Sequence, residues 1–405
     1  MEFLLTVLAI VACVFLFSFA VFIHEFGHFL AARRLGMRVD AFSIGFGPAL
    51  WKKKINGVEY RISAIPFGGY VALPDLDPEG TKCLEGQNGK EDQNAEAVPE
   101  VAAWKRVVVA FMGPFGNIVL AVALAVLLSL VPGARFGEVP AEIGVVPNEG
   151  PAFEAGLKAG DRILEVNGHG ISSWTDMQTE VQIAGGGTAL FVVERNGERK
   201  EFSVTPRQEK DLGAWYILAY STTNNAATSA WMPERNPLKQ LAWDASQIAR
   251  VLKALVTPKE AKSAAKALGG PVMIAEGLYR QVRRNVWDAI GFLRFLNVNL
   301  AMVNLLPIPV LDGGLILFAL FELLTRRKPP RKLVDGLSTV FMFALLGLML
   351  FLVYRDIDRS RRMHKAAEDY EQKRIEEYAR QERARNFKPA FKLETPAEME
   401  SKDPQ

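Results

Sequence analysis

The chain has 405 residues, of which 49% are hydrophobic and 23% are charged, and its formal net charge is +3. Its length allows two or three domains, and its apolar residues gather in long runs, which indicates membrane spans. The small net charge and the lack of a basic stripe with interleaved aromatics argue against a nucleic-acid partner. The chain has two cysteines, Cys13 in an apolar run and Cys83 in a polar one. They provide neither a disulfide framework nor a thiolate metal site.

The first predicted element is a membrane helix over residues 1–36. No charged residue occurs from Phe3 to Ile23, a run long enough to cross the roughly 30 Å hydrocarbon layer. Basic residues flank the cytoplasmic ends of membrane helices, so Arg33 and Arg34 predict a cytoplasmic end for this helix and an N-terminus outside. Since no basic region precedes the run and no small-residue cleavage site follows it, we expect the span to be retained.

Within this helix lies the pattern His24-Glu25-Phe26-Gly27-His28. Residues four apart lie on one face of a helix, so His24 and His28 can bind one metal ion. H-E-x-x-H on a helix is the two-histidine zinc pattern of metallopeptidases, and its glutamate, here Glu25, is the general base. Ionisable residues at membrane depth cost about 2.5–3.5 kcal/mol each and require a partner, water or a metal. The alternative is a surface helix that holds these side chains among the lipid headgroups.

Residues 37–73 are expected to form a membrane-associated β-hairpin on the cytoplasmic side. Asn56-Gly57 between two alternating runs is a strong hairpin-turn signal, and glycines such as Gly68 and Gly69 leave room for another backbone. An ordinary cytoplasmic hairpin explains the same residues. Residues 74–103 have no periodicity and are typical of a cytoplasmic loop.

A second membrane helix is predicted over residues 104–132. Within it, Gly113-Pro114-Phe115-Gly116-Asn117 provides small residues for a close approach of helices and one polar side chain directed inward. We interpret Asn117 as a structural residue that bonds a neighbouring helix.

Residues 133–208 have a soluble composition with short strand-like runs, which indicates a separate domain. The run from Ala155 to Gly168 closely resembles the signature of a PDZ domain, as found in bacterial proteases. On that resemblance, the preceding strand is the edge of a groove that pairs with an extended peptide, and its residues are Ile143, Gly144 and Val145.

Residues 209–286 form an amphipathic linker region. Apolar residues recur there at helical spacing, and a helix with one apolar face can lie on the outer membrane surface or pack on the preceding domain. The sequence favours neither placement.

Residues 287–325 form a third membrane region, broken between Asn304 and Gly314 by two prolines and two glycines. Irregular backbone at membrane depth is tolerated only when it is buried in protein or lines a wet cavity. This break carries Asp312, the natural third ligand, because catalytic zinc takes three protein ligands. The alternative is an interfacial aspartate that caps a short helix.

A fourth span is predicted over residues 333–354, and residues 355–405 form a charged tail to which we assign no chemistry. In order, the elements predict a polytopic α-helical membrane protein with four spans, a membrane-associated β-hairpin and an inserted α/β PDZ domain.

The paired motifs resemble the site-2 protease family, and most closely its bacterial regulator-of-sigma-E protease branch with a single PDZ domain. The likeness covers most of residues 1–354 and rests on His24-Glu25-x-x-His28 in the first span and Asn304-x-x-Pro307-x-Pro309-x-Leu311-Asp312-Gly313-Gly314 in a later one. It implies an intramembrane zinc endopeptidase in which Zn2+ is held by His24, His28 and Asp312 and Glu25 is the base.

The resemblance also implies how a substrate is held. Asn304 would contact the substrate backbone, and Gly68, Gly69 and Tyr70 belong to the hairpin whose edge is expected to hold the substrate as an extended strand. A helical peptide bond is hydrogen-bonded and shielded, so cleavage requires local unwinding, and a free strand edge can replace the lost bonds.

The predicted function is cleavage of transmembrane segments of single-span proteins that an upstream site-1-type protease has already shortened, such as anti-sigma factors or remnant signal peptides. The expected location is the bacterial cytoplasmic (inner) membrane, within the lipid bilayer, with the PDZ domain on the periplasmic side. The rival reading is a membrane-anchored PDZ scaffold with a non-catalytic metal site, which would have no need of Glu25. A soluble secreted zincin conflicts with the apolar spans.

Overall fold

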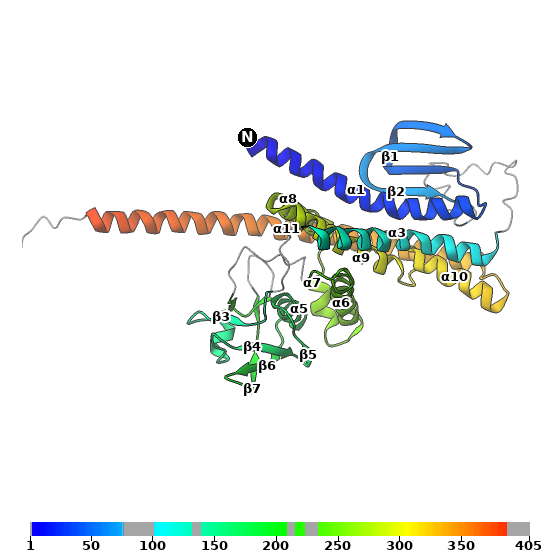
Figure 1. Cartoon of the computed structure of the whole chain (residues 1–405). Helices are drawn as coiled ribbons and strands as arrows, with labels where there is room; N and C mark the ends of the chain where they lie inside the picture. Colours follow the sequence, from blue (N-terminus) through cyan, green and yellow to red (C-terminus); the bar gives the residue numbers. More distant parts are fainter. Residues whose placement is uncertain are drawn as a thin grey trace, which may run out of the picture.

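A computed structural model describes residues 2–74, 76, 101–131, 139–208, 215–222 and 234–386 (Figure 1). Four of its helices are long and apolar enough to cross a membrane, namely Phe3–Arg34, Ala103–Leu130, Val286–Asn304 and Lys332–Arg362. These candidate spans fit the predicted polytopic helical membrane protein. Most of the predicted loop at 74–103 with Cys83, parts of the linker at 209–286 and the end of the tail lie outside the described residues.

Helices α1 (Glu2–Arg34) and α3 (Ala103–Leu130) pack with their backbones in contact. A Cβ atom added to Gly27 would lie 2.0 Å from the carbonyl oxygen of Met112. One added to Gly116 would lie 2.8 Å from the carbonyl oxygen of Ile23. Only residues without a side chain permit so close an approach, which confirms the role predicted for the small residues of α3.

Strands β1 (Ala41–Ile55) and β2 (Val58–Ala72) form a hairpin joined by the predicted two-residue turn. Asn56 and Gly57 both have positive φ, 52° and 85°. This conformation matches the twist of the flanking strands, and Asn-Gly adopts it readily. The turn predicted from these two residues is therefore confirmed.

Both strands bend, so that the hairpin becomes a small sheet. Ala41 pairs with Glu59 and also with Ala72, at the two ends of β2. Among the described residues, the segment 69–72 has a strand neighbour on one side only, which is the segment 41–44. The sheet therefore ends in an edge made by the last residues of β2.

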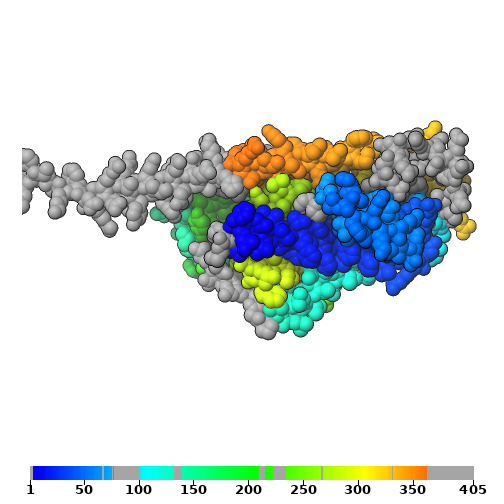
Figure 2. Space-filling model, turned by 90° about the horizontal axis from the view of Figure 1, so that it is seen from above, coloured from blue at the N-terminus to red at the C-terminus, as the bar shows by residue number. Residues whose placement is uncertain are grey.

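The hairpin is fixed to α1 by apolar contacts. A buried cluster joins the end of α1, the hairpin and α3, and it includes Ala32, Met37, Phe42, Val58 and Val109. In the view from above, the hairpin, in lighter blue, covers the part of α1 farthest from the N-terminus (Figure 2). The hairpin therefore stands at the turn of α1 that carries the two histidines and at the turn that follows.

An inserted domain follows α3 and comprises the described residues between 139 and 222. Its main sheet has the order β5-β4-β6-β7, and β10 pairs with β3 in a smaller one. Helix α5 starts with a capping box between Ser173 and Asp176. That this is a PDZ domain stays a prediction. The elements are β3 (Ile143–Val145), α4 (Pro151–Glu154), β4 (Arg162–Val166), β5 (His169–Gly170), α5 (Trp174–Ala184), β6 (Ala189–Arg195), β7 (Glu198–Val204), β8 (Arg207–Gln208), β9 (Trp215–Tyr216) and β10 (Tyr220–Ser221).

The structure corrects the predicted peptide groove. Ile143, Gly144 and Val145 are not a free edge, because β3 is already paired with β10 along its length. A Cβ atom on Gly144 would lie 2.7 Å from the carbonyl oxygen of Ser221, so the two strands leave no room for a peptide. On its other side, β3 exchanges backbone hydrogen bonds with Gly160 and Asp161.

Helix α6 (Pro237–Val256) lies between the inserted domain and the membrane bundle. On one side, Arg250 donates two hydrogen bonds to Glu180 of α5, at 2.5 and 2.7 Å. On the other side, the fully buried Arg294 of α9 donates to Asp244 at 2.7 and 3.0 Å. The amphipathic helix thus packs on the domain and on the bundle at once.

Helix α9 (Val286–Asn304) and helix α10 (Asp312–Thr325) form the third membrane region. The break between them falls at residues 305–311, as the prolines and glycines predict. The hairpin and the inserted domain lie on opposite sides of the layer that contains α3 and α9 (Figure 1).

The predicted fourth span and the beginning of the predicted charged tail, on either side of residues 354 and 355, belong to one helix. Helix α11 (Arg331–Asn386) continues through this point. Asp356 is buried and accepts a hydrogen bond of 3.0 Å from the backbone N–H of Met273, in α8 (Pro271–Arg284). Arg355 donates to the carbonyl oxygen of Ala265, in α7 (Ala261–Ala267), at 3.1 Å. These residues hold α11 to its neighbours.

Candidate metal centre

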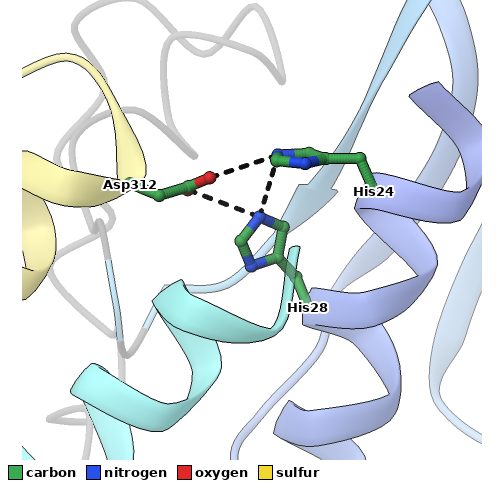
Figure 3. Close-up of side chains that lie close together, drawn as sticks. All are labelled: His24, His28 and Asp312. Carbon is green, nitrogen blue, oxygen red and sulfur yellow. Dashed lines mark hydrogen bonds and ion pairs between the residues drawn. The ribbon is translucent and has the colours of Figure 1, made fainter. Parts of the chain in front are cut away.

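Three side chains from distant parts of the chain meet beside α3 (Figure 3). His24 and His28 stand one turn apart on α1, and Asp312 is the first residue of α10. Nε2 of His24 lies 3.2 Å from Oδ2 of Asp312, and Nε2 of His28 lies 3.4 Å from Oδ1. The two Nε2 atoms are 3.3 Å apart. Within the described ranges, this is the one group of potential metal ligands whose atoms all lie within 4.8 Å of one another.

Each of these three separations is close to the distance between two ligand atoms of a tetrahedral zinc ion, with Asp312 offering a different oxygen to each histidine. Ligand atoms about 2.0–2.1 Å from zinc, at tetrahedral angles, stand about 3.3–3.4 Å apart. Oδ2 of Asp312 is buried and has no hydrogen bond within the described part of the chain. Because a buried carboxylate oxygen without a partner is costly, a cation between the three side chains explains the arrangement. Two imidazoles and a carboxylate are also a ligand set that catalytic zinc accepts.

Two glycines give Asp312 its position. A Cβ atom on Gly313 would lie 2.2 Å from the carbonyl oxygen of Leu306, and one on Gly314 would lie 2.2 Å from that of Ile308. The first turn of α10 can therefore pack directly on the preceding loop. Leu311 occupies the cap position of α10, so the alternative of a capping aspartate at 312 is not what the structure has.

Glu25 lies beside the histidines, at the edge of the hairpin. Its carboxylate lies close to the backbone of Val71 and to the three candidate ligands. A Cβ atom on Gly69 would lie 3.4 Å from Cγ of Glu25. The edge segment of β2 therefore lies next to the predicted base.

Two further residues predicted to hold a substrate lie close by. Asn304 ends α9, and its Nδ2 lies 3.4 Å from Nε2 of His24. Gly68 has a φ of 100° and lies under the ring of Phe46, where a Cβ atom would be 2.1 Å from Cε2. Glycine is required there for both reasons.

The side chain of Tyr70 is engaged within the hairpin. Its ring stacks on Phe46 with centroids 6.3 Å apart, and its hydroxyl accepts a hydrogen bond of 2.7 Å from Arg61. Arg61 also donates to Glu59 at 2.7 Å, and this bond holds the pKa of Glu59 below its usual value. These contacts fix the side chain of Tyr70 within the hairpin.

Helix α3 contributes groups that the sequence analysis did not assign to the site. The carbonyl oxygen of Val109 lies 2.8 Å from Nδ1 of His28, and Nδ2 of Asn117 lies 3.1 Å from Nδ1 of His24. A Cβ atom on Gly113 would lie 2.1 Å from Nε2 of His28. The sequence indicates this role of α3 only through Asn117, a polar residue within an apolar span, four residues after Gly113.

Comparison with known proteins gives a consistent result. The family model described as Peptidase family M50 matches residues 12–348. A Campylobacter jejuni protein named as a zinc metalloprotease, Cj1068, is 32% identical over 364 residues, which are 88% of this chain and 94% of the relative. The Bacillus subtilis protein named regulator of sigma-W protease RasP is 28% identical over 424 residues, covering 86% of this chain and 98% of that protein.

Proposed function

Because the chain belongs to peptidase family M50 and is therefore a zinc metalloprotease, we propose that it cleaves peptide bonds at membrane depth with a centre built from His24, His28 and Asp312. The observation that carries this proposal is the convergence of three side chains from the first and third membrane regions, whose ligand atoms, one from each residue, all lie within 4.8 Å of one another. These distances leave space for one ion and give it three protein ligands.

Each residue then has a defined task. Zn2+, when bound, supplies a Lewis acid that acidifies water and polarises the scissile carbonyl. Glu25 takes a proton from the attacking water and passes it to the leaving amine. Asn304, within hydrogen-bond reach of the same place, is positioned to donate to the substrate backbone.

A transmembrane substrate must unwind before it can be cut, and the hairpin supports that step. The segment 69–72 has a strand neighbour on one side only in the described part of the sheet, and it lies next to Glu25. An extended peptide that pairs with this edge through Gly68, Gly69 and Tyr70 would recover the backbone hydrogen bonds lost on unwinding.

The proposed substrates are membrane segments of single-span proteins already shortened by an upstream protease. The name of the Bacillus subtilis relative, a regulator of sigma-W protease, supports anti-sigma factors as one class of substrate. We place the protein in the bacterial inner membrane, with the inserted domain, proposed to be a PDZ domain, on the periplasmic side.

The direct test is cleavage by the purified protein in detergent. A panel of single-span peptides would be incubated with protein of measured metal content, before and after chelation and after Zn2+ is restored. We expect cleavage within the apolar segment that is lost on chelation and restored by Zn2+. A full metal equivalent without cleavage of any peptide would instead favour a membrane scaffold with a structural metal site.

Asp312→Ala is expected to reduce metal binding as severely as His24→Ala. Each substitution removes one of three protein ligands, so the loss of affinity should exceed the roughly 10- to 100-fold typical of residues outside the ligand shell. Chelator competition on the purified variants measures it. If Asp312→Ala keeps a full metal equivalent while losing activity, another residue is the third ligand.

The inserted domain is expected to act as a gate and not in bond cleavage. Arg195 donates two hydrogen bonds of 2.6 Å to the fully buried Asp161, so Arg195→Met leaves an unpaired buried charge that costs about 3–5 kcal/mol and opens the domain. Cleavage of an untrimmed substrate should then rise, while turnover of a short peptide stays the same.

The control for the gate is Lys200→Met in the same sheet. Lys200 pairs with Glu198 at the surface, where an ion pair contributes only about 0–1 kcal/mol. This variant should treat both substrates as the wild type does. Loss of short-peptide cleavage in Arg195→Met, but not in the control, would show that the domain is needed for catalysis itself.

A further inference from the structure

Helix α3 presents three groups to the histidines along one stripe. Val109, Gly113 and Asn117 follow one another at intervals of four residues, so they share a face of the helix. Nδ1 of His28 lies 2.8 Å from the carbonyl oxygen of Val109, and Nδ1 of His24 lies 3.1 Å from the amide of Asn117. Gly113, between them, leaves room for the ring of His28.

Both histidines need the same tautomer to turn Nε2 toward a metal. A neutral imidazole carries one proton, and the nitrogen that binds a metal must be the other one. For His28, the carbonyl oxygen of Val109 can only accept, so Nδ1 carries the proton and Nε2 is free. His24 requires an acceptor at Nδ1 in the same way, and the structure places Asn117 there.

The amide of Asn117 can provide that acceptor by turning over. Its side chain is fully buried, with Nδ2 toward His24 and with Oδ1 lacking any hydrogen-bond partner among the described residues. With Nδ2 in that place, Nδ1 of His24 would have to accept, so the ring proton would lie on Nε2, which could then not bind a metal. A rotation of the Asn117 amide by 180° would place its Oδ1 at Nδ1–H of His24. This oxygen would then accept a hydrogen bond, and Nε2 of His24 would be free to bind a metal.

We propose that Asn117 is a positioning residue whose Oδ1 accepts a hydrogen bond from Nδ1–H of His24 in the metal-bound protein, as the carbonyl oxygen of Val109 does from Nδ1–H of His28. The inference rests on the proposed metal centre, and its role is to hold the ring and tautomer of a ligand without contacting the substrate.

The test measures Zn2+ affinity by chelator competition and the visible absorption spectrum of the Co2+-loaded protein. Asn117→Leu keeps the volume but offers no acceptor, whereas Asn117→Asp offers an acceptor in either orientation. The matched control is Asn297→Leu on α9. Asn297 is also fully buried, its Oδ1 also lacks a partner in the described ranges, and its Nδ2 bonds only the carbonyl oxygen of Leu293 in its own helix.

We expect Asn117→Leu to weaken Zn2+ binding about 10- to 100-fold and to alter the Co2+ spectrum, because outer partners of a ligating histidine have effects of that size. Asn117→Asp should bind at least as tightly as the wild type, and Asn297→Leu should match the wild type in both measurements. Thermal unfolding of the metal-free variants shows whether a loss of affinity follows from a loss of fold.

Three results would overturn the inference. Wild-type affinity and spectrum in Asn117→Leu would show that His24 needs no partner there. Loss of binding in Asn117→Asp, with Asn297→Leu unaffected, would show that the amide acts by donating. Absence of Zn2+ binding by the wild-type protein would overturn the metal centre itself, and this inference with it.

Discussion

Glu25→Gln is expected to lower kcat by about 10²- to 10⁴-fold while the protein keeps its full metal equivalent, because proton transfer requires the carboxylate and ligation does not. The candidate ligands are His24, His28 and Asp312, whose atoms converge without Glu25. An amide is nearly the same size as a carboxylate and can still occupy the place beside Val71. Turnover of a single-span peptide and metal content, measured on the same preparation, separate the two effects.

Glu59→Gln is a suitable control for this substitution. Glu59 lies in the same hairpin and pairs with Arg61 at 2.7 Å, but it is not part of the centre. The Glu59→Gln variant should cleave the single-span peptide at the wild-type rate. Cleavage at the wild-type rate by Glu25→Gln would exclude Glu25 as the base, and loss of the metal in that variant would make it a ligand.

Gly113→Ala is expected to abolish metal binding and activity together. The added methyl carbon would lie 2.1 Å from Nε2 of His28, the nitrogen that faces the other two ligands. The ring must move by more than about 1 Å to restore a normal contact of 3.5–4.0 Å, which takes it out of the ligand position. Metal content by elemental analysis should fall to background.

The matched control is Gly347→Ala in helix α11, where an added Cβ atom meets nothing within 4 Å. Alanine is a better helix former than glycine, so this variant should be as stable as the wild type or slightly more so. Crowding in the helix interface itself costs about 1–3 kcal/mol in Gly113→Ala. A full metal equivalent in folded Gly113→Ala would show that α1 and α3 can separate at this point.

The residues of the centre that belong to short sequence motifs could be predicted from the sequence. His24 and His28 are related by helical periodicity alone, and the break that carries Asp312 is marked by its prolines and glycines. The turn at Asn56-Gly57 could likewise be predicted from adjacent residues alone. In each case, neighbours in the sequence determine the conformation.

The remaining features depend on register between distant segments. Asn117 contacts His24 only because α1 and α3 meet at their glycines, a registration that neither helix encodes alone. The predicted groove at Ile143–Val145 failed for a similar reason, because the strand that covers it, Tyr220–Ser221, lies far along the chain. Likewise, the burial of Asp356 depends on a distant segment, because its carboxylate accepts a hydrogen bond from a backbone N–H of α8.

The backbone of Val71 lies beside the carboxylate of Glu25, so the proposed base adjoins the same strand that we propose receives the substrate. A peptide paired with that strand is aligned by its main chain, so the distance from the pairing site to the cut is counted in peptide units and is independent of side-chain identity. We therefore expect the enzyme to cut at a fixed number of residues from the segment that pairs with the strand. Substrates of unrelated sequence should share the spacing between their unwound segment and their scissile bond, and shifting that segment by two residues should move the cut by two.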